Sequence, residues 1–247
     1  MVLRFEFRLA RVLLHFALGL GTCALVFPWA PRAWRDWLVR RWSRQLLTIC
    51  GVRVEDLPGA APLRHALVVA NHVSWLDIFV INATHPSRFV AKAEIRAWPV
   101  VGWLVAAAGT VFIARGNRRD LRHIFKGLVD RLHEGQRVAF FPEGTTAPQG
   151  TVLPFHANLF EAAIDAKVPV QPYALRYVDA AGNYHGAVDY IGETTFVQSM
   201  IAILNAQGIR AQVRCLPVLE AAGAHRRELA QAAHDAIGRA LGRADGV

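Results

Sequence analysis

The run Ala66-Leu-Val-Val-Ala70, followed at once by Asn71-His-Val-Ser-Trp-Leu-Asp77, is the stretch from which the fold can be predicted. Five consecutive apolar residues are typical of a short strand that is buried on both faces, and the polar residues come where this strand ends. Sites in open α/β sheets form at the carboxyl ends of strands. The stretch therefore predicts an α/β sheet with His72 at its edge, in reach of solvent and substrate.

His72 is a candidate general base, because a neutral imidazole accepts a proton from a hydroxyl near pH 7 when a second group holds the ring. Asp77 is the nearest carboxylate. Residues five apart do not share a helix face, so we expect His72 in the turn and Asp77 in the first turn of the next helix. Asn71 or Ser74 is the expected helix cap. For this motif alone, a histidine that only hydrogen-bonds within its turn is the competing interpretation.

A second polar cluster, Pro142-Glu-Gly-Thr-Thr146, follows a predicted strand at residues 137–141. Gly144 permits a tight turn in which backbone N–H groups and the Thr145 hydroxyl face one point, an arrangement that suits an anion. Glu143 is expected to orient a neighbouring cation. Taken alone, the pattern is also compatible with an ordinary turn.

Arg115 stands at a third strand end, after the β-branched and aromatic run at residues 110–114. A single arginine there is also compatible with a solvated loop residue. The remaining pattern alternates strands and helices without a repeat or linker, so residues 54–247 are expected to form a single α/β domain with a largely parallel or mixed sheet flanked by helices. Further strands are predicted at 88–91, 169–177 and 209–215, and helices at 94–108, 121–132, 159–167, 196–205 and 221–243. Trp98 and Trp103 are expected to pack in the core, and Pro99 to lie near the start of its helix or to divide it.

The amino-terminal end predicts a membrane-associated helical segment over residues 1–53. Val12–Ala30 carries no charge and approaches the roughly 20 apolar residues that cross a bilayer. Arginines precede it, as in a signal peptide, but Pro28-Trp-Ala-Pro-Arg32 is a poor cleavage site. A full span and a helical hairpin that dips into one leaflet both remain open, since arginines flank the run on both sides.

The distribution of charge along this basic chain favours lipid over nucleic acid as its partner. Residues 1–53 hold nine arginines against Glu6 and Asp36, so they carry +7 of the net +9. Tryptophan and arginine alternate over residues 32–44 beside the apolar run, a pattern that fits headgroups and anionic lipid better than nucleic acid. The three cysteines have no paired spacing, which predicts neither disulfide nor metal site and indicates a reduced, cytoplasm-facing domain.

Four segments together resemble the sequence blocks of the PlsC-type glycerolipid acyltransferases, in order and approximate spacing over about residues 66–177. The segments are Asn71-His-x4-Asp77, Phe112-Ile-x-Arg115, Phe141-Pro-Glu-Gly-Thr145 and Val168-Pro-Val-x-Pro172. The resemblance implies a glycerol-3-phosphate acyltransferase-like fold and an enzyme of phospholipid biosynthesis. On these segments the chain looks like a 1-acylglycerol-3-phosphate O-acyltransferase. Such an enzyme would make phosphatidic acid from lysophosphatidic acid at the cytoplasmic face of the inner membrane.

The same resemblance implies roles for the strand-end residues. His72 would deprotonate the free hydroxyl of the lysolipid, Asp77 would orient His72, and the hydroxyl would attack an acyl thioester. Arg115, Gly144 and Thr145 would contact the acceptor phosphate. Glu143 would support that site, and Lys92, from the family-like segment Lys92-Ala-Glu94, is a further substrate-binding candidate. No cofactor or metal is implied: acyl-CoA or an acyl-ACP is the co-substrate, and acyl carrier protein is a candidate partner.

Two positions depart from the family pattern. Thr146 follows the Glu-Gly-Thr where many members have a basic residue, and His156 stands where lysine or arginine is frequent. Reduced positive charge leaves lyso-ornithine lipid or another lysolipid open as the acceptor. A membrane-attached lipid-binding protein without turnover is the non-enzyme alternative, against which the complete set of motif residues argues.

Overall fold

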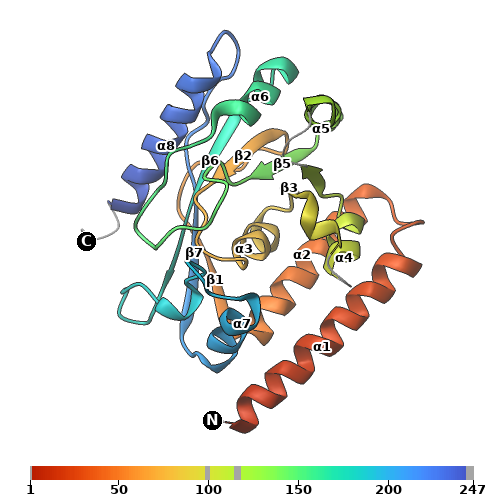
Figure 1. Cartoon of the computed structure of the whole chain (residues 1–247), viewed down its shortest axis with the longest axis vertical. Coiled ribbons are helices and arrows are strands. Elements are labelled where there is room, and N and C mark those ends of the chain that lie inside the picture. The colour runs from red at the N-terminus through yellow and green to blue at the C-terminus, as the bar shows by residue number, and fades with distance from the viewer. Residues whose placement is uncertain (1, 98–100, 114–117, 243–247) are drawn as a thin grey trace.

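A mixed seven-stranded sheet lies between layers of helices in the computed structural model, which describes residues 2–97, 101–113 and 118–242 (Figure 1). The sheet order is β1-β7-β6-β2-β5-β3-β4. The strands are β1 (Val52–Leu57), β2 (Ala66–Ala70), β3 (Arg88–Lys92), β4 (Val111–Ile113), β5 (Arg137–Phe140), β6 (Val170–Val178) and β7 (Ile209–Cys215). The α-helices are α1 (Val2–Leu25), α2 (Arg32–Ile49), α3 (Asp77–Thr84), α4 (Val101–Ala107), α5 (Arg118–His133), α6 (Glu161–Ala166), α7 (Phe196–Asn205) and α8 (Arg226–Gly242), with 3-10 turns η1 (Ala93–Ala97), η2 (Ala157–Phe160) and η3 (Gly186–Val188).

Strand direction brings the predicted polar clusters to one edge of the sheet. β2 pairs in parallel with β5 and β6, and β3 pairs in parallel with β5 and β4. β7 runs antiparallel to β6, and β1 is parallel to β7. The carboxyl ends of β2, β3, β4, β5 and β6 therefore lie along the same edge. The expectation of a largely parallel or mixed sheet is confirmed.

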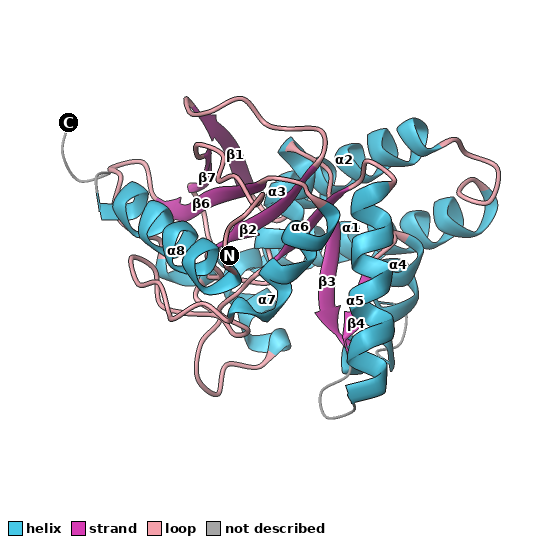
Figure 2. Cartoon of the chain, turned by 90° about the horizontal axis from the view of Figure 1, so that it is seen from above, coloured by secondary structure: helices cyan, strands magenta, loops and turns pink. Residues whose placement is uncertain are grey.

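The central strand β2 is apolar throughout because both of its faces are covered, as helices on both sides of the strands show in Figure 2. Leu67 and Val69 belong to a core that includes apolar residues of α5, α6 and α8. Val68 and Ala70, which alternate with them, belong to a core that includes residues of α2, α3 and α7. Full burial of one such Leu or Val side chain stabilises the fold by about 1.5 to 3 kcal/mol.

The two amino-terminal helices form a hairpin in which α1 lies along the outside of the molecule and α2 packs between α1 and α3 (Figure 1). The ring of His15 stacks on Trp42 at a centroid distance of 4.6 Å. A Cβ on Gly19 would come within 2.6 Å of the Trp42 indole nitrogen, so glycine permits this close approach of α1 to α2. Arg8 donates from Nη1 to the carbonyl oxygens of Leu204, at 2.8 Å, and Ala206, at 2.7 Å. These contacts fasten α1 to α2 and to the end of α7.

Part of this hairpin meets the criteria for a membrane segment. In the described part of the chain, one helix, at Arg4–Leu25, is long and apolar enough to cross a bilayer, and 17% of its most apolar window is buried. The helix begins well before the predicted Val12 and ends before Ala30, because the chain turns over residues 26–29. At the other end of the hairpin, Leu46 and Leu47 of α2 are fully buried in the core.

Several sequence expectations need correction. The helix predicted at 94–108 is η1 followed by α4, with residues 98–100, and so Trp98 and Pro99, outside the described residues. Trp103 is 48% exposed, so its expected place in the core is wrong. The last helix begins at Arg226 rather than 221, because Gly223 takes a left-handed conformation, with φ 74°, within a turn. Strand β1, which contains the end of the predicted 1–53 segment, was not predicted.

The exposed face of α1 should decide whether the protein stays on a bilayer. Leu14 and Leu18 are 60% and 61% exposed, and a charge in the apolar centre of a membrane costs about 2.5 to 3.5 kcal/mol. We expect Leu14→Asp/Leu18→Asp to move a large share of the full-length protein into the detergent-free soluble fraction. Sedimentation with liposomes measures this.

The matched control is Thr151→Asp/Gln207→Asp, which adds the same charge at exposed positions outside the hairpin. It should sediment as the unmodified protein does. High salt should release neither the control variant nor the unmodified protein from the liposomes, because the apolar contact is not screened. Equal release of both double variants would contradict attachment through α1.

Candidate active site

The turn after β2 is fixed by Asn71, which continues the strand pairing with its side chain. Its amide nitrogen donates to the carbonyl oxygen of Leu175 at 2.9 Å, and its amide oxygen accepts from the Leu175 N–H at 2.8 Å. Asn71 is therefore tied to β6 and does not cap α3. Ser74 does not cap the helix either, since the residue before α3 is Leu76 and has no side-chain capping bond. The expected cap is wrong, and Asp77 organises the turn instead.

The Asp77 carboxylate is completely buried and accepts four hydrogen bonds. Oδ2 accepts from the N–H groups of Val73, at 2.7 Å, and Ser74, at 2.9 Å. The same oxygen lies 2.8 Å from Nδ1 of His72, which is the contact that the sequence spacing predicts. Oδ1 accepts from the hydroxyl of Tyr177 at 2.7 Å. Burying a carboxylate is costly unless it is fully hydrogen-bonded, and these donors meet that condition.

The other ring nitrogen of His72, Nε2, is available to accept a proton. With Nδ1–H donating to Asp77, the neutral ring carries its lone pair on Nε2, which has no partner among the described residues. The ring stacks on Phe141 at a centroid distance of 4.0 Å and an interplanar angle of 7°. The side chain is 19% exposed. The ring is therefore held on one side by a carboxylate, on its face by an aromatic ring, and is open at the basic nitrogen.

Glu143 connects the turn after β2 to the turn after β5. Its Oε1 accepts from the His72 backbone N–H at 2.8 Å, and its Oε2 accepts from the Leu153 N–H at 2.8 Å. The Ala147 N–H donates to the His72 carbonyl oxygen at 2.8 Å. Burial raises the pKa of Glu143, and the two backbone N–H donors oppose that rise. Among the described residues both oxygens therefore hold backbone groups, whereas a neighbouring cation was expected.

The Glu-Gly-Thr segment forms the tight turn that Gly144 predicts. Gly144 has φ 71°, a left-handed conformation that favours glycine, and its N–H donates to the Phe141 carbonyl oxygen at 3.1 Å. That N–H serves the turn and does not face outward. Thr145 is exposed, and the hydroxyl of Thr146 donates to the Tyr190 carbonyl oxygen.

For the two predicted cationic residues, Lys92 and Arg115, the structure describes only the strand that contains or precedes each one. Lys92 is the last residue of β3, beside β5, and its side chain lies outside the described part of the structure. Arg115 follows β4, and it also lies outside the described residues. The ends of β3 and β4 are on the same edge of the sheet as His72.

Two residues of this centre were missed as site residues in the sequence. Tyr177 lies 100 positions from Asp77 and reaches it because β6 is the direct neighbour of β2. Phe141 was placed at the end of a strand and at the start of the third motif block, but no contact with His72 was expected from it. The available signal was weak, because Tyr177 is one of two tyrosines in a strand that also contains Gln171 and Arg176. As a whole, the arrangement can take a proton from a hydroxyl and return it to a leaving group.

Comparison with known proteins gives consistent matches. A model of the Acyltransferase family matches residues 51–176. The lyso-ornithine lipid O-acyltransferase of Pseudomonas aeruginosa is 38% identical over 245 residues, which cover 97% of this chain and 94% of that protein. The 1-acyl-sn-glycerol-3-phosphate acyltransferase of Neisseria gonorrhoeae is 53% identical over 116 residues, 47% of this chain and 46% of that protein.

A solved structure has the same architecture. The crystal structure of the 1-acyl-sn-glycerophosphate acyltransferase PlsC from Thermotoga maritima matches with a TM-score of 0.71, covers 99% of this chain and 95% of its own, and is 21% identical. At that identity the likeness shows the fold. The family model spans half of the chain, and the Pseudomonas relative is similar along nearly all of it. This chain therefore belongs to the PlsC-type acyltransferase family.

Proposed function

We propose that the protein transfers a fatty acyl chain from a thioester to the free hydroxyl of a lysolipid, with His72 as the general base. Nε2 takes the hydroxyl proton while the oxygen attacks the thioester carbonyl. The carbon–sulfur bond then breaks, and the imidazolium returns the proton to the departing thiolate. The observation that carries the proposal is the 2.8 Å contact between His72 Nδ1 and the fully buried Asp77, which stabilises the imidazolium.

For the acceptor we propose 1-acyl-sn-glycerol-3-phosphate, which gives phosphatidic acid. The support is the 53% identity to the Neisseria 1-acyl-sn-glycerol-3-phosphate acyltransferase over about half of the chain. In this proposal Arg115 binds the phosphate, Lys92 and Thr145 are further contacts at neighbouring strand ends, and Gly144 shapes the turn that presents Thr145.

Lyso-ornithine lipid is the second candidate acceptor. It is favoured by the similarity to the Pseudomonas lyso-ornithine lipid O-acyltransferase, which extends over 97% of the chain. It is also favoured by Thr146, an uncharged residue whose hydroxyl is engaged with Tyr190. His72 and Asp77 would act in the same way on either acceptor.

We also propose that the enzyme works at the cytoplasmic face of the inner membrane with acyl-CoA or acyl carrier protein thioesters. The free cysteines Cys23, Cys50 and Cys215 fit a reducing compartment. The packing of α1 along α2 and α7 favours a hairpin that lies in one leaflet over a helix that leaves the domain to cross the bilayer.

His72→Ala should lower kcat by about 10²- to 10⁴-fold or more, the range for loss of a general base. Asp77→Asn should be comparably impaired, because an amide cannot stabilise the imidazolium and favours the wrong tautomer. Steady-state assays of folded, purified protein measure both. His133→Ala, an exposed histidine at the end of α5, is the control. Near-normal turnover of His72→Ala would reject the mechanism.

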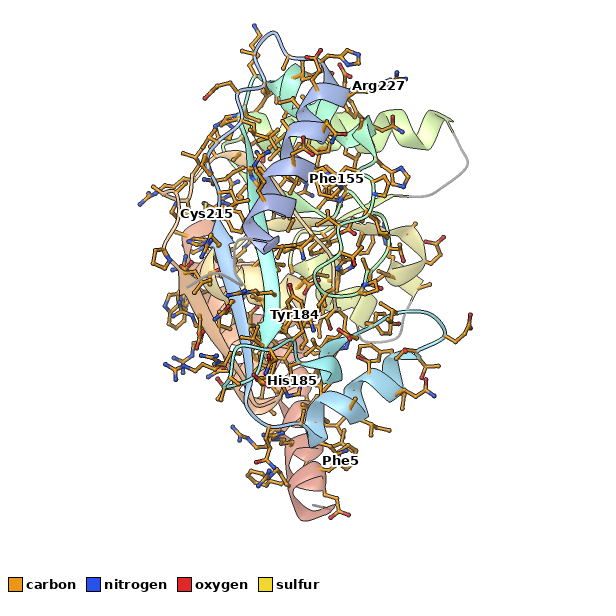
Figure 3. All side chains as sticks on the ribbon, turned by 90° about the vertical axis from the view of Figure 1, so that its left-hand side faces the viewer. Phe5, Phe155, Tyr184, His185, Cys215 and Arg227 are labelled. Atoms are coloured by element: carbon orange, nitrogen blue, oxygen red, sulfur yellow. The ribbon has the colours of Figure 1, made fainter. Side chains whose placement is uncertain are left out.

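Tyr177→Phe should lower kcat by about tenfold or more and leave the KM values for both substrates nearly unchanged. The substitution keeps the ring but removes a hydrogen bond to a buried charge, which is worth about 1.5 to 3 kcal/mol. The control is Tyr184→Phe, because Tyr184 is 42% exposed on the turn after β6 (Figure 3). Identical kcat values for the two variants would show that Tyr177 does not position Asp77.

Arg115→Lys should raise KM for the lysolipid more than KM for the thioester, because lysine cannot reproduce the two directed hydrogen bonds of a guanidinium to an anion. With the unmodified enzyme and one thioester, rates on 1-acylglycerol-3-phosphate, 1-acylglycerol and lyso-ornithine lipid identify the acceptor. The rate on 1-acylglycerol, which lacks the phosphate, should be only a small fraction of the rate on 1-acylglycerol-3-phosphate. Equal rates on 1-acylglycerol and its phosphate would exclude the phosphate assignment, and preference for lyso-ornithine lipid would establish the second candidate.

A further inference from the structure

A basic cavity lies at the end of the molecule opposite to His72. Its volume is about 400 Å³, and its lining includes Arg32, Arg35, Arg88, Arg131 and Glu134. Arg88 is the first residue of β3, whereas the last residue of β3 is at the edge that carries His72. The cavity is therefore at the amino-terminal edge of the parallel strands, between the α1–α2 turn and the ends of α4 and α5. It is separate from the proposed reaction centre.

The positive charge around this cavity is only partly neutralised. Arg88 donates to Asp36 Oδ1 at 2.6 Å and to the Ala108 carbonyl oxygen at 3.2 Å. Arg32 donates to the Glu134 carbonyl oxygen at 3.2 Å, and Arg35 to the Ala30 carbonyl oxygen at 2.8 Å. These two arginines therefore contact backbone oxygens and form no ion pair within the described residues.

The Arg131 guanidinium has no hydrogen-bond or ion-pair partner in the part of the chain that the structure describes. Burial lowers the pKa of Arg88, Asp36 opposes this, and the nearby Arg32 and Arg131 lower it further. The guanidinium groups therefore repel one another. An anion between them would relieve that repulsion and take their unused N–H donors.

The backbone is shaped to hold Arg88 at this place. Gly109, in the turn between α4 and β4, has φ 86°, and a Cβ there would come within 2.9 Å of Arg88 Cδ and 3.2 Å of its Nε. Only glycine combines that conformation with that space. The arginine stem consequently lies against the chain, with its side chain 11% exposed.

The surroundings of the cavity indicate which anion reaches it. The lining also includes Phe27 and Ala30 of the α1–α2 turn. Leu25 and Trp29 in the same region are 76% and 87% exposed, and tryptophan favours the headgroup level of a bilayer. A volume of this size admits a phosphate with its glycerol, and the apolar wall suits the start of the acyl chains.

We propose that this cavity binds the phosphate of an anionic membrane phospholipid, at a site distinct from that of the lysolipid acceptor. Bilayer lipid is the source because the cavity opens beside the exposed apolar turn. Arg32, Arg35 and Arg131, which have no acid partner within the described residues, supply the directed hydrogen bonds. A lipid held there would fix the hairpin turn against the amino-terminal edge of the sheet.

The test is binding of dioctanoyl phosphatidylglycerol to the full-length protein in a neutral detergent, followed through the ligand-induced rise in the thermal unfolding midpoint. Arg131→Gln should weaken binding by at least about tenfold, the factor for loss of one charge-assisted hydrogen bond. Arg32→Gln/Arg131→Gln should weaken it further. Arg131 has no partner in the described structure, so the single variant removes no contact on which folding depends.

Three comparisons make the outcome decisive. Arg41→Gln and Arg4→Gln/Arg41→Gln remove the same charge from exposed positions of α2 and α1 and should bind normally. Arg115→Gln should also bind normally, which separates this site from the acceptor site. Equal weakening in the Arg41 and Arg131 variants would reduce the effect to general attraction, and loss only in Arg115→Gln would assign the lipid to the acceptor site. Either result would overturn the proposal.

Two further ligands identify the chemistry. Dioctanoyl phosphatidylcholine should give a much smaller rise than the anionic lipid at equal concentration. Inorganic phosphate at the same concentration should also give a smaller rise, because it lacks the glycerol and chains. An equal rise with inorganic phosphate would overturn the lipid assignment and leave a site for free phosphate.

Discussion

The burial of the Asp77 carboxylate is the constraint on which the candidate active site depends. A charge without access to water must find its hydrogen bonds within the protein. Its donors come from the turn after β2, from His72 and from β6. Once those bonds are made, the position of the turn, the tautomer of the imidazole and the register of a neighbouring strand are no longer independent. The hydrogen bonds that the buried charge requires therefore fix the direction in which Nε2 of His72 points.

A second buried carboxylate extends this constraint across the sheet. Glu143 holds backbone groups of both the β2 turn and the segment after the β5 turn. Motif residues that are 71 positions apart in sequence are therefore parts of one hydrogen-bonded unit. This explains why a glutamate, rather than a residue with one acceptor, suits the position: both oxygens are occupied, each by a different loop. The turn glycine next to it allows the chain to reverse within that small space.

What could be predicted from the sequence follows from how local each signal is. β2 and α7 were placed correctly because an apolar run and a helical period lie within a few residues, and α7 also begins with a Thr195–Gln198 capping box. The contact between His72 and Asp77 was predicted because five residues separate them. β1 was missed because the boundary between the amino-terminal segment and the domain was placed at residue 53, inside Val52–Leu57, and because the apolar–charged alternation of this edge strand stops at the adjacent Glu55 and Asp56.

The Tyr177 bond could not be predicted, because it requires the strand order β6-β2, which no local pattern contains. The true bonding of Glu143 was missed for a related reason. Its partners are backbone groups, and every residue type except proline offers an N–H. A carboxylate beside a predicted anion turn suggested a cation instead. A side-chain contact could thus be predicted where the partner was a titratable residue nearby in sequence. It could not be predicted where the fold brought in a partner from a distant part of the chain.

The hairpin that lies along the domain has a consequence for how substrate arrives. At 1.5 Å per residue the 24 residues of α1 extend about 36 Å, from the turn at the basic cavity to the neighbourhood of α7. The indole nitrogen of Trp75, in the turn that carries His72, donates to Ser199 of α7 at 3.1 Å. With the hairpin in one leaflet, as proposed, a bilayer surface that follows α1 would pass close to the candidate active site. In that orientation the proposed lysolipid acceptor would diffuse to the enzyme in two dimensions, so turnover would follow its mole fraction in the membrane rather than its bulk concentration, and added inert lipid would slow the reaction by surface dilution.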